Sequence, residues 1–171
     1  EHDRDRRLTV RDVSGKPTTL RTATATARLT LEAATVVLIT ERKIPKGDPL
    51  EVAKVAAVQA VKNTASIIPY CHPIPIEFVD VAFGVERAHI DVSVTVKAVA
   101  RTGVEMEALT GAAVAALTLY DMLKMLDATM AIGEVRLAEK KGGKSDLTPP
   151  AGEKLRAAVL VLSVSVAAGR A

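Results

Sequence analysis

Aromatic residues are rare in this sequence: they make up 2% of its 171 residues, and tryptophan is absent. Proteins that bind single-stranded nucleic acid stack bases on aromatic side chains, so we expect no nucleic-acid partner. The net charge is also small, at +3 from 23 basic and 20 acidic residues. This balance weakly favours anionic ligands, and small phosphorylated molecules are the ligands that we expect.

Cysteine and long apolar runs are scarce as well. Cys71 is the one cysteine, so no disulfide can form within the chain, as is usual for cytoplasmic proteins. No apolar run approaches the ~20 residues that a membrane span needs. No apolar stretch follows the polar first seven residues, as it would in a signal peptide. The sequence therefore predicts a cytoplasmic protein with no membrane partner.

A long helical pattern covers residues 102–124. Ala, Leu, Met and Glu dominate it from Glu105 onward, and Gly111 is its one interior helix breaker. Asp121 and Lys124 are three residues apart, so they are neighbours on the helix, at the edge of its apolar stripe. Helical spacing predicts that this buried stripe consists of Leu109, Ala113, Ala116, Tyr120 and Leu123.

Acidic residues mark the start of this helix. Glu105 and Glu107 flank Met106 directly after a Thr-Gly turn. The helix dipole favours carboxylates in a first turn, so a helix start explains both residues without any function.

A second helix is predicted to begin after Asp48. Asp48 is a good N-cap, Pro49 suits the first helical position, and Glu51 completes a capping box. The helix should continue to Pro69. Lys46 lies just ahead of it, where free N–H groups favour an anion, although a solvated loop lysine fits this position equally well. The buried stripe of this helix is expected to consist of Leu50, Ala53, Ala57, Val61 and Ile68.

Three prolines stiffen residues 69–75. Because a proline follows it, His72 is held in extended geometry, which suits a ligand-binding side chain. Cys71 and His72 do not form a metal motif, since the other histidines, His2 and His89, do not lie at ligand spacing. We therefore expect no metal site.

Alternation of apolar and polar residues predicts strands over residues 21–31, 74–83, 90–98 and 133–141. Residues 32–43 are a β-branched run that fits either a strand or a short helix. With the two helices, the predicted order is β-α-β-β-α-β. This order is typical of an α+β fold, a ferredoxin-like sandwich with an antiparallel sheet and helices on one face.

Residues 142–145, Gly-Gly-Lys-Ser, do not form a phosphate-binding P-loop. That motif needs a glycine where this chain has Ala138, and a helix where it has Pro149 and Pro150. What remains is a flexible basic loop, able to close over a phosphate or to stay solvated. Its lysines are Lys140, Lys141 and Lys144.

Five short segments stand out between residues 9 and 146. They are KGD from residue 46, IPYCHP from residue 68, TGVEMEALT from residue 102, AALTLYDMLK from residue 115 and GGKS from residue 142. In this order, and with nearly these gaps, they resemble the MoaC family, the cyclic pyranopterin monophosphate synthases of molybdenum cofactor biosynthesis.

The resemblance implies a ferredoxin-like fold, a hexamer assembled from dimers, and a functional link to a radical enzyme that acts before this one in making molybdopterin. It also implies a lyase that needs no redox cofactor. Its substrate would be (8S)-3′,8-cyclo-7,8-dihydroguanosine 5′-triphosphate, which is converted to the pterin cyclic pyranopterin monophosphate with release of pyrophosphate.

The resemblance also assigns site residues. The catalytic residues are Asp121, Lys46 and Lys124. Segments that match substrate-binding segments contain Tyr70, Cys71, His72, Met106 and Glu107, and further pocket positions are Glu105, Lys62 and Lys144. Tyr70 replaces the leucine usual in the family, and Asp146 replaces a glycine. Because a lysine among other lysines has a lowered pKa, we expect these lysines to exchange protons, with Asp121 orienting Lys124 or accepting a proton.

The competing interpretation is a non-catalytic ligand-sensing or scaffold module, since a fold alone does not imply a function. The enzyme is favoured because a sensor has no reason to place Asp121 and Lys124 at a core edge near the rigid His72.

The length of the long helix raises a conflict. If residues 105–124 form one helix, Glu107 and Asp121 are about 21 Å apart along its axis, too far to share one reacting centre. We therefore expect a site shared between two chains of a symmetric dimer. The alternatives are a kink at Gly111 and a substrate that bridges the gap.

Residues 1–147 are expected to form the synthase domain, and residues 148–171 a proline-containing linker with an apolar, strand-like tail. The apolar run over residues 157–162 is similar to the first strand of a molybdopterin adenylyltransferase-type domain, although Val164 stands where an acid is expected. The alternative is an extra edge strand of the first domain.

Overall fold

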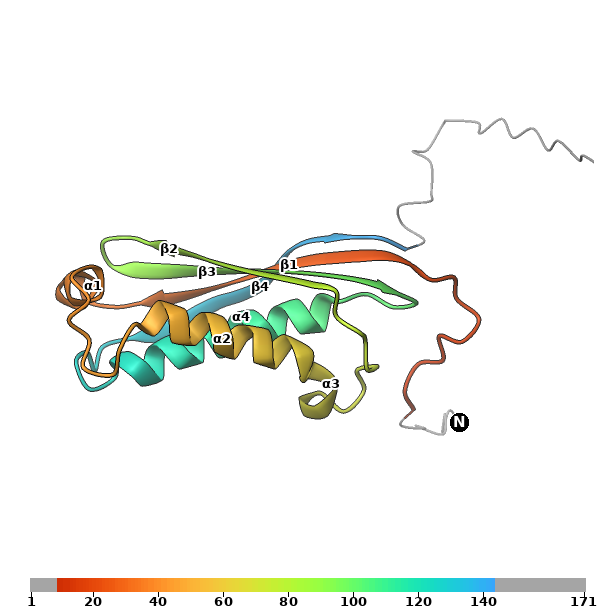
Figure 1. Cartoon of the computed structure of the whole chain (residues 1–171), viewed down its shortest axis with the longest axis horizontal. Coiled ribbons are helices and arrows are strands. Elements are labelled where there is room, and N and C mark those ends of the chain that lie inside the picture. Colours follow the sequence, from red (N-terminus) through yellow and green to blue (C-terminus); the bar gives the residue numbers. More distant parts are fainter. Residues whose placement is uncertain (1–8, 144–171) are drawn as a thin grey trace, which may run out of the picture.

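The computed structural model describes residues 9–143, so the predictions for Lys144 and for residues 148–171 lie outside the described residues. The described part contains four strands and four helices (Figure 1). Their bounds are β1 Thr19–Thr30, α1 Ala33–Thr40, α2 Pro49–Lys62, α3 Thr64–Ile67, β2 Phe78–Val85, β3 His89–Ala100, α4 Glu105–Leu123 and β4 Ala131–Lys141.

The four strands form one antiparallel sheet in the order β2-β3-β1-β4. Helices α2 and α4 lie side by side and cover one face of this sheet (Figure 1). On β1 and β3 every second residue is buried, among them Ala25, Leu29 and Val94. The predicted ferredoxin-like α+β fold is confirmed, with α1 and α3 as additional short helices.

The second predicted helix is shorter than expected, because α2 ends at Lys62 rather than near Ile68. The side-chain amide of Asn63 donates to the Gln59 carbonyl oxygen at 2.8 Å, and the Thr64 hydroxyl donates to that of Ala60 at 3.0 Å. Such side chains compete with the helical hydrogen bonds of the backbone, so the chain turns and continues as α3.

One open segment is resolved by the structure, and one predicted strand is shorter than expected. Residues 32–43, for which a strand and a helix were both open, contain helix α1. Strand β2 begins at Phe78 rather than at residue 74. Pro73 and Pro75 have no N–H group for the ladder, so the segment that contains them stays outside the sheet.

The buried face of α4 is rotated relative to the predicted stripe. Ala116 and Leu123 are buried as predicted, but Leu109, Ala113 and Tyr120 are only half-buried. The face that packs inward includes Glu107, Ala108, Gly111, Ala112, Ala115 and Leu119.

Gly111 acts as a packing residue rather than as a helix breaker. A Cβ atom at this position would lie 2.6 Å from Val61 Cγ2 on α2 and 3.1 Å from Val94 Cγ1 on β3. The missing side chain therefore lets α4 approach both α2 and the sheet closely.

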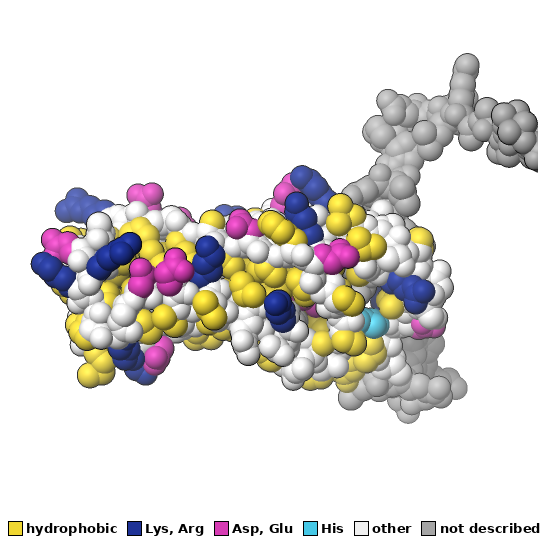
Figure 2. Space-filling model, viewed as in Figure 1, with side chains coloured by type: hydrophobic (Ala, Val, Ile, Leu, Met, Phe, Trp, Pro, Cys, Tyr) yellow, Lys and Arg dark blue, Asp and Glu magenta, His cyan; other side chains and the backbone are white. Residues whose placement is uncertain are grey.

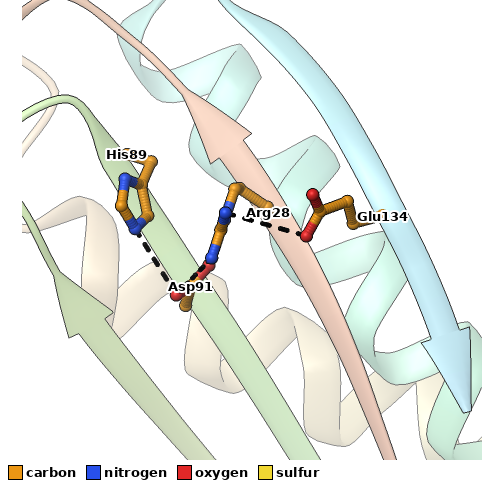
Figure 3. A network of polar contacts seen from close by, with 4 residues as sticks. All are labelled: Arg28, His89, Asp91 and Glu134. Atoms are coloured by element: carbon orange, nitrogen blue, oxygen red, sulfur yellow. Dashed lines mark hydrogen bonds and ion pairs between the residues drawn. The ribbon is translucent and has the colours of Figure 1, made fainter. Parts of the chain in front are cut away.

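Polar side chains lie on the sheet face away from the helices. The Arg28 guanidinium donates two hydrogen bonds to Asp91, which lies opposite it on β3, at 2.6 and 3.0 Å (Figure 3). Glu134 Oε2 on β4 lies 3.7 Å from Arg28 Nη1, and His89 Nε2 lies 3.5 Å from Asp91 Oδ2. Hydrogen bonding from Arg28 holds the pKa of Asp91 below its usual range. This network joins three neighbouring strands.

By length and composition alone, α4 could cross a membrane, and it is the one helix among residues 9–143 of which this is true. Of its most apolar window, 56% is buried within the protein, as in the core helix of a globular domain.

Hydrophobic side chains are also exposed on the face shown in Figure 2. Val55 on α2, Leu117 on α4 and Met125 beyond it are each more than half exposed, which suits contact with another chain.

Candidate active site

The three predicted catalytic residues meet at the C-terminal end of α4. Asp121 lies on the last turn of this helix, Lys124 is the first residue after the helix, and Lys46 comes from the loop before α2. Lys124 Nζ lies 2.6 Å from Asp121 Oδ1, and Lys46 Nζ lies 3.4 Å from Oδ2. Two ammonium groups therefore hold one carboxylate between them, near the negative end of the helix dipole.

Lys46 contacts the C-terminal end of α4, whereas the sequence left open a role at the N-terminus of α2 and a solvated loop position. At the N-terminus of α2, Asp48 Oδ1 accepts hydrogen bonds from the backbone N–H groups of Leu50 at 3.0 Å and Glu51 at 3.3 Å, which confirms the predicted N-cap. Lys46 instead donates to the backbone carbonyl oxygen of Asp121 at 2.8 Å. That carbonyl belongs to the last turn of α4, whose acceptors lack partners within the helix.

This cluster is open to solvent, with side chains that are 42% exposed for Lys46, 50% for Lys124 and 60% for Asp121. Hydrogen bonds from Lys124, and then from Lys46, hold the pKa of Asp121 below its usual range. The same contact with Asp121 raises the pKa of Lys124. The expected lowering of a lysine pKa is therefore wrong for Lys124, because its nearest charge is a carboxylate and not another ammonium group.

A cavity of about 260 Å³ lies at the opposite end of α4. Its rigid element is His72, whose Nε2 lies 2.8 Å from the backbone carbonyl oxygen of Arg11, so the ring is fixed against the N-terminal segment. The cavity is formed by the loop between α3 and β2 and by the first turn of α4. The predicted site residues that line it are Tyr70, Cys71, His72, Glu105, Met106 and Glu107.

Glu107 is deeply buried, at 4% exposure. Burial raises the pKa of its carboxyl group, and the neighbouring Glu105 carboxylate adds to this rise. Burial also raises the pKa of the Cys71 thiol, with a further contribution from Glu107. Burial in the cavity wall therefore shifts both Glu107 and Cys71 towards their protonated forms.

Lys62 lines a second cavity, of about 250 Å³. Glu107 lines both cavities, so Lys62 lies beside the predicted pocket. Across residues 9–143, no three His, Cys, Asp or Glu side chains are grouped in a way that would hold a metal ion.

A single chain does not bring all the predicted residues together. Helix α4 is continuous from Glu105 to Leu123 (Figure 1). At ~1.5 Å per residue, Glu107 and Asp121 are therefore about 21 Å apart along its axis. The expectation that Asp121 lies near His72 is wrong within one chain, since His72 shares its cavity with Glu107.

A third cavity, of about 370 Å³, adjoins the first and was not predicted from the sequence. The two cavities are both lined by Arg11, Thr102, Gly103 and Glu105. In the sequence its basic residues are scattered from the N-terminal segment to residue 141. Lys140 and Lys141, which the sequence had also assigned to the basic loop, were the available signal, and the structure places them at the end of β4. The basic residues that line this cavity are Arg11, Lys16, Arg21, Arg101, Lys140 and Lys141.

Comparison with known proteins identifies the family. The sequence profile of the MoaC family matches residues 10–143, a range that includes every described strand and helix. The chain is 50% identical to the cyclic pyranopterin monophosphate synthase of Parvibaculum lavamentivorans over 136 residues, which cover 78% of this chain and 85% of that protein. It is 49% identical to the synthase of the same name from Thermoanaerobacter sp. over 138 residues, 80% of this chain and 87% of that protein.

A longer match is to the molybdenum cofactor biosynthesis bifunctional protein of Chlorobaculum tepidum. The identity is 45% over 160 residues, which cover 94% of this chain but 50% of that protein. The chain thus spans half the length of this relative. Because the family profile covers most of the sequence and close relatives align along the same range, the chain belongs to the MoaC family.

Proposed function

We propose that this chain is a lyase of molybdenum cofactor biosynthesis, which converts (8S)-3′,8-cyclo-7,8-dihydroguanosine 5′-triphosphate to cyclic pyranopterin monophosphate and pyrophosphate. Its family and the names of its relatives support this reaction. The observation that carries the proposal is the cluster of Lys46, Asp121 and Lys124. It joins two parts of the family pattern that lie 75 residues apart in the chain, at an exposed site with no core to stabilise.

Closure of the cyclic phosphate is a group transfer for which this cluster has suitable groups. A sugar hydroxyl oxygen bonds to the α-phosphorus and gives up its proton, and the bond from that phosphorus to the pyrophosphate oxygen breaks. Asp121 orients the two ammonium groups and is the carboxylate of the cluster that can accept the proton. Lys46 and Lys124 neutralise the phosphate oxygens as charge develops on them.

Remodelling of the guanine-derived ring requires proton transfers of its own. The cavity lined by Cys71, His72 and Glu107 is the proposed place for this ring, because it holds titratable side chains beside a histidine that is fixed in place. Lys144 stays a proposed pocket lysine.

The complete site forms between two chains. A two-fold axis would bring the Glu107 end of one copy beside the Asp121 end of the other, which removes the conflict posed by the length of α4. Exposed Val55, Leu117 and Met125 support such contact. Assembly of dimers into a hexamer, the link to the preceding radical enzyme and a cytoplasmic location are further proposals from the family resemblance and the scarcity of cysteine.

Residues 1–147 are the proposed synthase domain, and residues 148–171 the proposed linker and start of a second domain. The Chlorobaculum relative supports this division, because an alignment over 94% of the chain continues past residue 143, where the family profile ends. Deletion of residues 150–171 should leave synthase activity unchanged. A large loss of activity would favour an extra edge strand of the first domain.

The function is tested by incubating the purified chain with the cyclised GTP intermediate. Pyrophosphate release should be detected by a coupled assay, and the cyclic phosphate product by mass spectrometry. Absence of both from a folded protein that binds the intermediate would favour the ligand-sensing or scaffold module instead.

Single alanine substitutions test the cluster itself. Lys46→Ala, Asp121→Ala and Lys124→Ala should each abolish turnover while leaving the melting temperature close to that of the wild type, because loss of an exposed side chain opens no core cavity. Lys54→Ala, at an exposed position of α2, is the matched control and should keep full activity. A variant that is inactive only because it is unfolded would lose its catalytic assignment.

A further inference from the structure

One buried carboxylate follows the catalytic cluster in the chain without being part of it. Asp127 is 3% exposed and lies three residues beyond Lys124, in the segment between α4 and β4. Within residues 9–143, no lysine, arginine or histidine forms an ion pair with it. A buried charge is costly unless it is paired or hydrogen-bonded, so neutral donors must hold this carboxylate.

Backbone and hydroxyl groups supply these donors. Asp127 Oδ1 accepts hydrogen bonds from the backbone N–H of Thr129 at 2.8 Å and from its hydroxyl group at 2.7 Å. Oδ2 accepts one from the backbone N–H of Glu32 at 2.7 Å and one from the Thr35 hydroxyl group at 3.3 Å. Burial alone would raise the pKa of Asp127, but these hydrogen bonds, led by that from Glu32, hold the pKa below its usual range. The carboxylate is therefore ionised at neutral pH.

The two donors to Oδ2 belong to the start of α1. Glu32 is the N-cap residue of this helix, and its own side chain caps no backbone group. In a capping box, a carboxylate at the third helical position accepts a hydrogen bond from the backbone N–H of the N-cap residue. That position is Thr35 here, and Asp127, 95 residues beyond Glu32, supplies the carboxylate instead. Asp127 thus joins the segment after α4 to α1.

Each of the two segments joined in this way carries a lysine of the catalytic cluster. The backbone N–H of Asp127 donates to the Leu123 carbonyl oxygen at 3.2 Å, which fixes the turn that contains Lys124. Helix α1 leads directly into the loop that contains Lys46, and this loop lies at the same end of the molecule as the segment after α4 (Figure 1).

The loop after α1 is held at successive points up to Lys46. The backbone N–H of Lys43 donates to the Leu38 carbonyl oxygen on α1 at 2.8 Å, and Ile44 is buried in the core. The N–H of Gly47 donates to the Ile44 carbonyl oxygen at 3.1 Å, which closes a tight turn around Lys46. A displacement of α1 would therefore displace the backbone of Lys46.

We infer that Asp127 is a positioning residue for the proposed reaction: by joining α1 to the segment after α4, it sets the place of Lys46 relative to Asp121 and Lys124. The inference rests on the proposed function and adds a residue outside its cluster. Lysine side chains are long and these two are exposed, so both ammonium groups meet one carboxylate only where the backbones that carry them are held in place. A displacement of about 1 Å in a reacting group can lower a rate by about a hundredfold.

Steady-state rates test this role. Asp127→Ala should lower kcat by about ten- to a hundredfold, with KM close to that of the wild type, because the ring pocket at the other end of α4 is untouched. Asp127→Asn should keep more activity, since its amide oxygen can still accept hydrogen bonds on one side. Thr35→Val removes one donor to Asp127 and should lower kcat by less than Asp127→Ala does. Asp80→Asn, at an exposed position of β2, is the matched control and should behave like the wild type.

A second control separates positioning from stability. Val96→Ala removes buried core volume from β3 and should lower the melting temperature, but Val96 lies in neither of the joined segments. All rates are measured at a temperature at which circular dichroism shows every variant to be folded, and Val96→Ala should then keep the kcat of the wild type. A loss of kcat in Val96→Ala as large as that in Asp127→Ala would overturn the positioning role.

Hydrogen exchange followed by mass spectrometry gives a readout that does not depend on activity. Asp127→Ala should speed backbone exchange over residues 124–130 and also over residues 41–48, to which its side chain donates and from which it accepts no hydrogen bond. Val96→Ala should leave both ranges unchanged. Unchanged exchange over residues 41–48 in Asp127→Ala would show that the contact with α1 does not hold Lys46. If Asp127→Ala does not fold, Asp127→Asn and Thr35→Val allow the same comparison.

The outcomes separate this inference from the proposed function. If the wild type releases no pyrophosphate from the cyclised GTP intermediate, the function itself is wrong, and hydrogen exchange alone decides whether Asp127 places Lys46. If the wild type turns over and the folded Asp127→Ala and Asp127→Asn proteins match its kcat, the positioning role is wrong and the function stands.

Discussion

At the scale of single residues, the candidate catalytic cluster depends on pairing rather than on burial. Lys46 and Lys124 approach the same carboxylate from different segments, and all three side chains remain exposed. An exposed ion pair contributes little to stability, so a cluster of this kind is free to exchange its internal contacts for contacts with a substrate.

The pKa of Asp121 should report on its contacts with both Lys46 and Lys124. Its lowered pKa means that the ion pairs are intact above the ordinary aspartate value, about 3.9, and are lost as the pH falls through the lowered one. Lys124→Ala should move the titration of Asp121 up towards the ordinary value, and Lys46→Ala should move it by less, because Lys124 is the larger cause. The carboxyl carbon signal of Asp121, followed by NMR from pH 2 to 6, measures the change.

Lys54→Ala is the control for this titration and should leave it unchanged. An Asp121 titration that is the same in all four proteins would show that the contacts with Lys46 and Lys124 do not persist in solution. On the alkaline side the raised pKa of Lys124 keeps the pair intact up to and beyond the ordinary lysine value.

Glu107 predicts a pH dependence of the opposite kind. Its pKa is raised by burial, so the unfolded chain releases this proton at a lower pH than the folded chain does. Stability should therefore fall as the pH rises from about 4.3, the ordinary glutamate value, through the raised one. Glu107→Gln has no such proton to lose, and its melting temperature should decline less than that of the wild type between pH 4 and pH 8.

The control for this measurement is Glu86→Gln, in the exposed turn between β2 and β3, which should keep the pH dependence of the wild type. Protein concentration must be the same in all samples, because association also stabilises a folded chain. Equal slopes for the wild type and Glu107→Gln would mean that the carboxyl group is not desolvated.

The residues of the site were predictable to different degrees. The family pattern located Asp121, Lys124 and Lys46, and the structure brings them together. Arg21 and Arg101 gave no local signal, because the basic cavity exists only after β1, β3 and β4 have paired. The direction of the Lys124 pKa shift could not be predicted by counting nearby lysines either, because it depends on which charged group lies closest.

At the scale of elements, α4 is defined by how closely it packs. Gly111 should be irreplaceable, although at an exposed position inside a helix alanine is more stabilising than glycine by about 1 kcal/mol. We expect Gly111→Ala to lower the free energy of unfolding by about 1–3 kcal/mol, because its methyl group would press on Val61 and Val94. Urea unfolding measures this change.

Gly133→Ala on β4 is the matched control, since a Cβ atom there has nothing within 4 Å. Val61→Ala combined with Gly111→Ala should restore part of the loss by making room on α2. A Gly111→Ala protein as stable as the wild type would show that α2 and α4 can separate without cost.

The buried face was easiest to predict for elements that have one apolar face and one polar face. On β1 small apolar residues alternate with threonine and arginine, so its buried face follows from the sequence. On α4 alanine occurs on nearly every side, and spacing alone selected Leu109 and Tyr120, which are only half-buried. Packing against α2 and the sheet selects the inward face, and that choice depends on the absent side chain of Gly111.

At the scale of the whole molecule, the two groups of site residues occupy opposite ends of one helix. Mixing inactive Glu107→Ala and Asp121→Ala proteins under conditions that exchange subunits tests whether two chains complete one site. Partial recovery of pyrophosphate release is expected, because some mixed interfaces contain one fully wild-type pocket.

Exchange itself must be followed independently, for example with chains of different mass. Absence of recovery despite exchange would place the whole site in one chain, with a substrate that bridges both ends of α4. Mixing Lys46→Ala with Asp121→Ala is the matched control and should give no recovery, since these two residues belong to the same half of the site.

The continuity of α4 also constrains how the length of this chain can evolve. Each residue of a helix advances the chain by about 1.5 Å and turns it by about 100°, so a single deletion between Met106 and Asp121 would rotate the carboxylate away from Lys46. Insertions in the exposed turn over residues 86–88 would disturb neither end. Natural length variants should therefore accumulate in that turn and be absent from α4, even at positions where the helix faces solvent.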